Sequence, residues 1–413
     1  MNSMAVAETH LAPSALAPRV AACQNALLWL VGFGGAIVFI EPSPYELATL
    51  VALIFFVLTG LSLRLALLPL ILLLFLINIG YTISAAHLLN LPRIVNWILT
   101  SWYLAITAIF FSMVISENTE ERLRYLSRGM IFGAVIAAFA GVAGYFGLAS
   151  RSLFTLYGRA SGTFKDPNVL GAYLILPSLF AIQSVVLDDF RKAFRNALVV
   201  GLFAVAILLA FSRAAWGQFV LTSLFMLVLM VLTSDSRAQR NRIILTSIIA
   251  VFACAFLLTI LLSLDAVQEL FRQRASFDQS YDGGRFGRFG RHILGAQMAL
   301  ELPLGIGPLQ FTKFFPEDTH NSYLNAFMSG GWLTGICYPV MILITTVFGF
   351  RHVFVRVPWQ RAYLAIFASF LGTVAEAAII DTDHWRHFWL TLGAMWGMFI
   401  AARHYCARQH LPK

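Results

Sequence analysis

The chain has 413 residues, of which 59% are hydrophobic and 12% are charged, and its formal net charge is +9 at pH 7. A soluble globular protein carries about 25% charged residues, so this composition excludes a water-soluble fold. The apolar residues occur in blocks of about 18–20, long enough to cross a bilayer as helices, whereas β-barrel strands would be shorter and alternating. The composition predicts an all-α, polytopic bundle of transmembrane helices.

The apolar blocks predict about twelve membrane spans, at residues 24–41, 45–61, 64–80, 95–115, 126–148, 168–187, 196–211, 214–233, 242–264, 322–350, 361–380 and 385–403. The stretch 196–233 is too long for one span, and Ser212-Arg213 predicts a tight turn within it. These spans divide the chain into an N-terminal tail (1–23), nine helices (24–264), a long loop (265–321) that contains short amphipathic helices, three helices (322–403) and a C-terminal tail (404–413).

The basic residues predict the orientation of the spans. They recur in alternate short connections, as at Arg191-Lys192 and at Arg351, and the positive-inside rule assigns such connections to the cytoplasm. Twelve spans then leave both termini cytoplasmic and the loop 265–321 on the other face. Because orientation explains the positive charge, and no soluble domain carries a basic patch interleaved with aromatic residues, no nucleic-acid partner is expected.

The four cysteines are scattered and show no disulfide or metal-ligand spacing. They lie at positions Cys23, Cys254, Cys337 and Cys406. They are typical of isolated apolar residues, so no structural metal is expected.

A polar stretch precedes the sixth apolar block. Gly162 permits a tight backbone, and Asp166 or Asn168 can cap the helix that follows. Arg159 and Lys165 stand beside that helix N-terminus, which is a favourable place for an anion. The alternative is an ordinary capped loop.

Arginines also stand where insertion into a membrane does not explain them. Arg213 is the only charged residue in the apolar stretch 196–233. It either has a function or extends its aliphatic side chain so that the guanidinium reaches the membrane interface. Arg285, Arg288 and Arg291 follow one another in the long loop, and residues 288–300 predict an amphipathic helix. Their guanidinium groups suit phosphate oxygens, although an interfacial helix that binds lipid headgroups is equally consistent.

Two further polar segments border the last spans. His320 lies just before the tenth apolar block, where it can act as a base near neutral pH or belong to a helix-capping cluster. Asp381 and Asp383 stand in the last outer loop. They could imitate a metal-binding pair, but a solvated turn with interfacial aromatic residues is the favoured interpretation.

These motifs, in this order, resemble the O-antigen ligase and polymerase family of bacterial membrane glycosyltransferases. The similarity covers roughly residues 150–350, and its elements are Arg159-Ala-Ser-Gly-Thr-Phe-Lys-Asp-Pro-Asn168, Ser212-Arg213, a loop arginine ahead of Pro303-Leu-Gly-Ile-Gly307, and His320-Asn-Ser-Tyr-Leu324 before Gly330-Gly-Trp-Leu-Thr-Gly335. The family often has a tryptophan four residues after its loop arginine. His292 stands there if Arg288 is the match, which leaves Arg285 and Arg291 as alternatives.

The resemblance implies a metal-independent, inverting transferase of the membrane-embedded GT-C type, without a cofactor, in the bacterial inner membrane. Such an enzyme moves a glycan from undecaprenyl pyrophosphate to an acceptor sugar hydroxyl on the periplasmic face. Arg213, Arg288 and Arg159 would bind the pyrophosphate, and His320 would be the base. The supporting residues would be Arg285, Arg291, Asp166, Asn168, Asn321 and Asp383.

The sequence leaves the acceptor open. A ligase would use lipid A–core and a polymerase a second lipid-linked glycan, and we favour the ligase, although no motif separates the two. A lipid-linked glycan transporter is the alternative of another class. It would more typically show internal repeats, paired broken helices and charges at mid-membrane, none of which is evident.

Overall fold

The structure is a computed structural model that describes residues 16–275 and 283–409. Its helices are α1 (Leu16–Gly34), α2 (Pro44–Gly60), α3 (Leu68–Ser84), α4 (Pro92–Ile115), α5 (Thr119–Tyr145), α6 (Arg151–Phe154), α7 (Pro167–Tyr173), α8 (Ile175–Leu187), α9 (Phe190–Leu209), α10 (Arg213–Leu232), α11 (Arg237–Leu262), α12 (Asp265–Ala275), α13 (Arg288–Glu301), α14 (Ser322–His352), α15 (Gln360–Glu376) and α16 (Arg386–Gln409), with three 3₁₀ turns, η1 (Leu65–Leu67), η2 (Ala86–Leu88) and η3 (Phe311–Lys313). Strands β1 (Thr155–Leu156) and β2 (Arg159–Ala160) form an antiparallel hairpin in which Thr155 pairs with Ala160. The all-α prediction is confirmed.

Each predicted apolar block contains a helix, but not every such helix is equally suited to cross a membrane. Within the described residues, eight helices are long and apolar enough to do so: Leu65–Ser84, Pro92–Ile115, Thr119–Tyr145, Pro167–Leu187, Phe190–Leu209, Arg213–Leu232, Arg237–Leu262 and Ser322–His352. The remaining candidates, α1, α2, α15 and α16, are shorter or less apolar. The count of twelve spans therefore stays a prediction.

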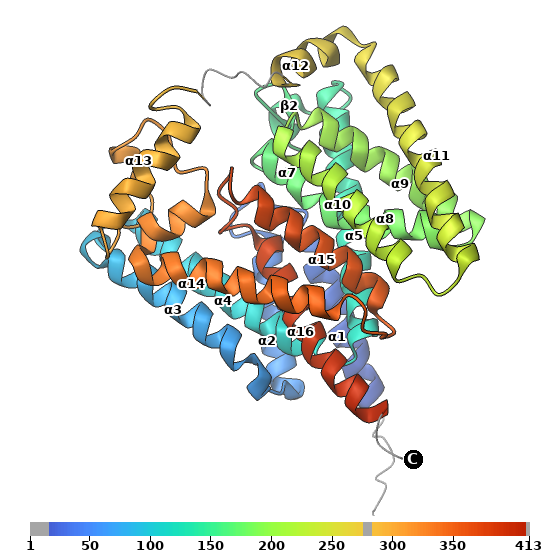
Figure 1. Ribbon diagram of the computed structural model, residues 1–413, viewed down its shortest axis with the longest axis horizontal. Helices are drawn as coiled ribbons and strands as arrows, with labels where there is room; N and C mark the ends of the chain where they lie inside the picture. Colours follow the sequence, from blue (N-terminus) through green and yellow to red (C-terminus); the bar gives the residue numbers. More distant parts are fainter. Residues whose placement is uncertain (1–15, 276–282, 410–413) are drawn as a thin grey trace, which may run out of the picture.

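Burial explains why the helices differ in hydropathy. Helix α11 runs along the edge of the bundle (Figure 1), its most apolar window is 6% buried, and its mean hydropathy is 2.7. In α16, by contrast, every residue from 388 to 402 is buried, and the helix packs against α4, α14 and α15. A helix enclosed by protein contacts little lipid, so apolar composition alone identifies it poorly.

Two helices extend beyond the predicted spans, and the limits of the two tails stay predictions. Helix α1 begins at Leu16 and ends at Gly34, so the predicted limit between the tail 1–23 and the first span falls inside it. The apolar residues that follow α1 form a loop and do not continue the helix. The Val38 amide in this loop donates to the Thr163 carbonyl at 2.9 Å, which attaches the loop to the segment after β2. At the other end, α16 continues to Gln409, beyond the predicted limit at 403.

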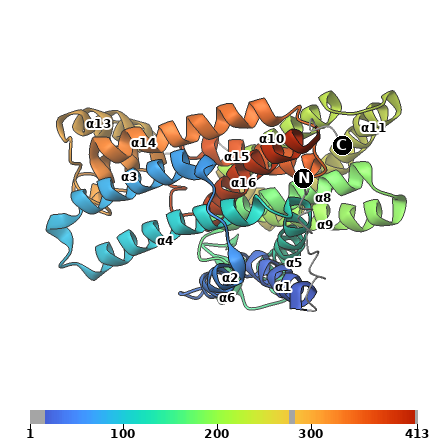
Figure 2. The same ribbon diagram turned by 90° about the horizontal axis from the view of Figure 1, so that it is seen from below.

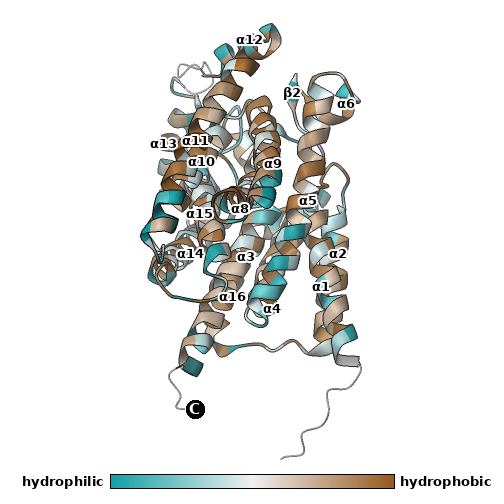
Figure 3. Ribbon diagram, turned by 90° about the vertical axis from the view of Figure 1, so that its right-hand side faces the viewer, coloured by the Kyte–Doolittle hydropathy of each residue, from teal (hydrophilic) through white to brown (hydrophobic). Residues whose placement is uncertain are grey.

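Helices α4 and α16 pack against each other and run in the same direction, with Ala108 beside Gly393 and Ile115 beside Gly397. Helices α1, α2 and α5 lie together on one side of the bundle and α14 lies on the other (Figure 2). Helix α1 begins and α16 ends at one end of the bundle, opposite α12 and β2 (Figure 3). Helices α10 and α15 pack side by side, so both of their ends can build sites between them.

Helix α14 is broken at Gly331, and the break holds α13 in place. Gly331 has a φ of 66°, and a side chain there would collide with Pro303 and Leu304. The Trp332 amide donates to the Pro303 carbonyl at 2.9 Å, and the Ile306 amide donates to the Met328 carbonyl at 2.7 Å. The motifs Pro303-Leu-Gly-Ile-Gly307 and Gly330-Gly-Trp-Leu-Thr-Gly335 are therefore the two halves of one joint. This joint holds α13 against the start of α14.

Candidate functional site

A cavity of about 1120 Å³ lies between α10 and α15, beneath the β1–β2 hairpin, α13 and the segment before α14. Five residues predicted from four separate motifs line it: Arg159, Asn168, Arg213, Arg288 and His320. Their positions in the chain span more than 150 residues, so only the fold brings them to one place.

Two of the arginines stand at helix N-termini. Arg213 is the first residue of α10, and the Ser212 hydroxyl caps that helix by accepting from the Ala215 amide at 3.4 Å. This confirms the tight turn predicted at Ser212-Arg213. Arg288 is the first residue of α13. A helix N-terminus carries a partial positive charge and unpaired amides, so each guanidinium adds to a surface that already favours an anion.

The three loop arginines have different surroundings. Arg288 lines the cavity and donates to the Ile379 carbonyl at 3.4 Å. Arg291 is 2% exposed and pairs with Glu317 at 2.7 Å, while Arg285 is exposed and lies over the Phe286 ring. Arg291 therefore holds the loop together, and of these three only Arg288 faces the cavity.

The hairpin residues brace the cavity wall. Arg159 is buried and donates from Nε to the Ala210 carbonyl and from Nη2 to Asn168 Oδ1, both at 2.7 Å. Asp166 caps α7 by accepting from the Asn168 amide at 2.6 Å, as one of the two predicted caps. Gly162 has a φ of 55° against the α5 backbone, which confirms the tight turn. These contacts tie the hairpin to the end of α9.

His320 is held by its backbone. It adopts a φ of 45°, an uncommon conformation for a residue other than glycine, and its amide donates to Asp381 Oδ2 at 3.0 Å. The same carboxylate accepts from the Thr319 hydroxyl at 2.8 Å and from the Asn321 amide at 2.9 Å. The cap of α14 is Asn321, whose Oδ1 accepts from the Leu324 amide at 3.0 Å. The His320 side chain is therefore left for a role other than capping.

The titration of this cluster favours a neutral imidazole. Burial lowers the pKa of His320 below its usual 6.5, and the nearby Arg288 lowers it further. Burial also raises the pKa of the Asp381 carboxyl to about 7, helped by the neighbouring Asp383. Asp381 Oδ2 lies 3.8 Å from His320 Nδ1. A histidine that is neutral near pH 7 is available to accept a proton.

The favoured prediction for the last outer loop, a solvated turn, is wrong. Thr382 and Asp383 are buried, and Asp383 Oδ2 accepts from Asn325 at 3.0 Å and lies 3.2 Å from His384 Nδ1. The loop folds inward because Thr382 and Ser322 bond to each other, which fastens it to the start of α14. Asp383 accordingly supports the loop and does not line the cavity.

Away from the arginines the cavity wall is largely apolar and runs along both helices. Leu221 and Phe225 contribute from α10, and Ala368 and Leu371 from α15. Gly217 also lines this wall, and a Cβ at this position would meet nothing within 4 Å. The cavity therefore joins a cationic end to a largely apolar channel between α10 and α15.

Several lining residues were not foreseen from the sequence. Arg274 lies near the end of α12 and adds a further positive charge. Glu376 is buried near the end of α15, where the Gln218 amide, turned so that its nitrogen faces the carboxylate, donates to Oε2 at 2.9 Å. A lone acid in an apolar helix is a signal for function in membrane proteins and could have marked Glu376. Arg274 has no such signal.

The part of the chain that the structure describes contains no cluster of three or more histidine, cysteine, aspartate or glutamate side chains that could hold a metal ion. Comparison with known proteins adds no assignment: no family model matches the chain, and no curated protein matches it.

Proposed function

We propose that the chain is a metal-independent, inverting glycosyltransferase of the O-antigen ligase type. It would move a glycan from undecaprenyl pyrophosphate to an acceptor sugar hydroxyl at the periplasmic face of the bacterial inner membrane. The observation that supports this most is one cavity that combines arginines at two helix N-termini with an apolar wall between membrane helices. A polyprenyl pyrophosphate has that combination of a polyanionic head and a long apolar tail.

The arginines would stabilise the leaving group. Arg213 and Arg288, which both line the cavity, would contact the pyrophosphate oxygens, and charge-assisted hydrogen bonds to such oxygens strengthen as the sugar–oxygen bond breaks. Arg159 would keep the wall in shape, because two of its nitrogens already donate to Ala210 and Asn168.

His320 would act as the general base. The acceptor hydroxyl attacks the anomeric carbon from the face opposite the pyrophosphate, the new glycosidic bond forms as the bond to pyrophosphate breaks, and the hydroxyl proton passes to the imidazole. The Asp381 carboxylate near Nδ1 would leave Nε2 for the acceptor. A base of this kind typically contributes about 10²–10⁴ in rate.

The acceptor separates the ligase from the polymerase alternative. We would purify the full chain and supply a glycan donor on undecaprenyl pyrophosphate with either lipid A–core or a second lipid-linked glycan. Transfer to lipid A–core supports the ligase, and chain extension supports the polymerase. Loss of glycan-capped lipopolysaccharide or of surface polysaccharide length after gene deletion would give the same distinction in cells.

Two outcomes contradict the proposal. Movement of the lipid-linked glycan across a vesicle bilayer without any transfer product would identify a transporter. Loss of transfer in EDTA, restored by Mg²⁺ or Mn²⁺, would replace the arginine mechanism with a metal-assisted one and direct attention to Asp381 and Asp383.

A further inference from the structure

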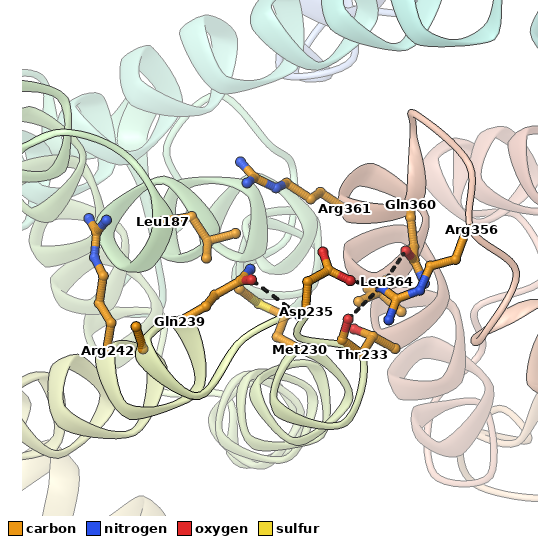
Figure 4. Close-up of a pocket in the computed structure, with 11 residues that line it drawn as sticks. Leu187, Met230, Thr233, Asp235, Gln239, Arg242, Arg356, Gln360, Arg361 and Leu364 are labelled. Atoms are coloured by element: carbon orange, nitrogen blue, oxygen red, sulfur yellow. Dashed lines mark hydrogen bonds and ion pairs between the residues drawn. The ribbon is translucent and has the colours of Figure 1, made fainter.

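A second cavity, of about 420 Å³, lies at the other ends of α10 and α15 (Figure 4). Its lining includes the last residue of α8, the C-cap of α10, the second and third residues of α11 and the first residues of α15. Helix α10 has 20 residues, so its two ends lie about 30 Å apart. This cavity is therefore separate from the one that contains His320.

Three arginines converge on this second cavity from two distant parts of the chain. Arg242 comes from α11, while Arg356 and Arg361 come from the connection between α14 and α15 and from the start of α15. The one acid in the lining, Asp235, pairs with Arg356 at 3.0 Å. Within residues 16–275 and 283–409, neither Arg242 nor Arg361 forms an ion pair. The cavity consequently keeps two uncompensated positive charges.

The lining of this cavity combines charged and apolar side chains. In Figure 4 the Arg361 guanidinium extends away from Asp235, toward the side that carries Arg242. Arg242 is itself fixed by donating to the backbone carbonyl of Asp188. Met230 and Leu364, which are both buried, add apolar side chains to the lining. A polar anion can therefore contact the arginines while an apolar chain attached to it contacts the apolar part of the lining.

Membrane orientation does not explain this geometry. The positive-inside rule needs basic residues in the connections but does not require them to meet around a hollow. Here arginines from the first turns of α11 and α15 and from the connection before α15 meet where several helices end, which is the level of lipid headgroups. Basic pockets between helices at that level bind anionic headgroups, and guanidinium groups match phosphate oxygens in two-point contacts.

We infer that this second cavity binds the phosphate headgroup of an anionic phospholipid, with Arg242 and Arg361 as the principal contacts. The lipid joins α8 and α11 to α15, and it thereby holds together the ends of the same helix pair whose opposite ends form the larger cavity. The inference depends on a membrane location alone and is independent of the proposed glycosyl transfer.

The test is lipid binding by the full chain in an uncharged detergent, followed by thermal unfolding. Phosphatidylglycerol raises the unfolding temperature more than phosphatidylcholine, because a ligand of the folded state stabilises it. Arg242→Gln and Arg361→Gln each weaken phosphatidylglycerol binding about tenfold, as expected for the loss of one charge-assisted contact. Arg240→Gln on α11 and Arg351→Gln on α14 are matched controls, since both side chains are exposed and lie outside the lining.

Further measurements identify which ligand binds and in which cavity it binds. Inorganic phosphate alone gives a much smaller stabilisation than phosphatidylglycerol, and Arg288→Gln, in the larger cavity, keeps the phosphatidylglycerol effect. Equal effects of the two lipids, or equal losses in Arg240→Gln, overturn the inference. So does full stabilisation by inorganic phosphate, which identifies a soluble-anion site, or a loss confined to Arg288→Gln, which places the lipid in the larger cavity.

Discussion

The two ends of the α10–α15 pair both gather arginines, but they differ in what surrounds them. At one end the arginines stand at helix N-termini beside His320, whose amide is bonded to Asp381. At the other end they come from α11, from α15 and from the connection before α15, around a smaller cavity with no histidine in its lining. Positive charge by itself therefore indicates only that an anion binds. The end that also contains a neutral, positioned imidazole is the one at which a reaction is expected.

The largest effect is expected from removing the imidazole. His320→Asn should lower transfer by about 10²–10⁴ while leaving donor binding nearly intact. Asparagine tolerates the positive φ of 45° better than most residues, so the loop should keep its shape. Transfer and donor binding are measured at matched protein levels, with His320→Ala as the comparison for backbone effects. An asparagine variant with near wild-type transfer would rule out the base.

The pH profile gives an independent check on the same residue. Because burial and Arg288 lower the pKa of His320, the imidazole should be deprotonated above an inflection that lies below pH 6.5. The transfer rate should therefore rise with pH through that inflection and then level off. A rate that falls over the same range would show that a protonated group is needed instead, contrary to the base assignment.

The next effect concerns which loop arginine holds the anion. Arg288→Lys should weaken donor binding about 10- to 100-fold, because an ammonium loses the two-point contact that a guanidinium makes. Arg285→Lys is the matched control on the same loop and should change binding little, since Arg285 is exposed away from the cavity. Donor titration of both variants distinguishes the positions. Equal losses would mean that the loop contributes general charge only.

A smaller effect is expected from filling the apolar channel. Gly217→Leu should weaken binding of the lipid-linked donor about tenfold, because the new side chain would occupy the open space beside α10. Stability should not fall, since leucine is a better helix former than glycine. Gly201→Leu on α9 is the control, as a Cβ there also meets nothing within 4 Å but lies outside the cavity. If Gly217→Leu binds the donor as well as the wild type does, the apolar tail of the donor binds outside this channel.

The smallest effect on transfer is expected from the opposite end. Arg361→Gln should leave transfer within about twofold of wild type when lipid is in excess, because α10 separates the two cavities by about 30 Å. It should still lower the stabilisation by phosphatidylglycerol. If the variant is fully folded but loses most of its transfer activity, the two ends of the helix pair are coupled and do not act independently.

The predicted fold and the candidate site depend on different information. Long apolar blocks and turn residues are local properties, so the helices, the turn at Ser212-Arg213 and the cap at Asp166 could be predicted from the sequence. The conformation of the last outer loop could not be predicted in this way. In the sequence Asp383 resembles a solvent-exposed acid, and only the fold brings Asn325 and His384 into contact with it. The end of α1 at Gly34, before the predicted end of the first span at 41, has the same origin. The loop after α1 is bonded to Thr163, which is distant in the chain.

The sequence by itself determined that this is a helical membrane protein with isolated arginines and a histidine at helix ends, because hydrophobicity and capping act over a few residues. Only the tertiary structure decided which of these side chains meet. Arg288 faces the cavity and Arg291 does not, because Arg291 pairs with Glu317 and the joint at Gly331 holds the end of α13 against α14. Such choices depend on contacts between segments distant in the chain, and neither composition nor spacing encodes their geometry.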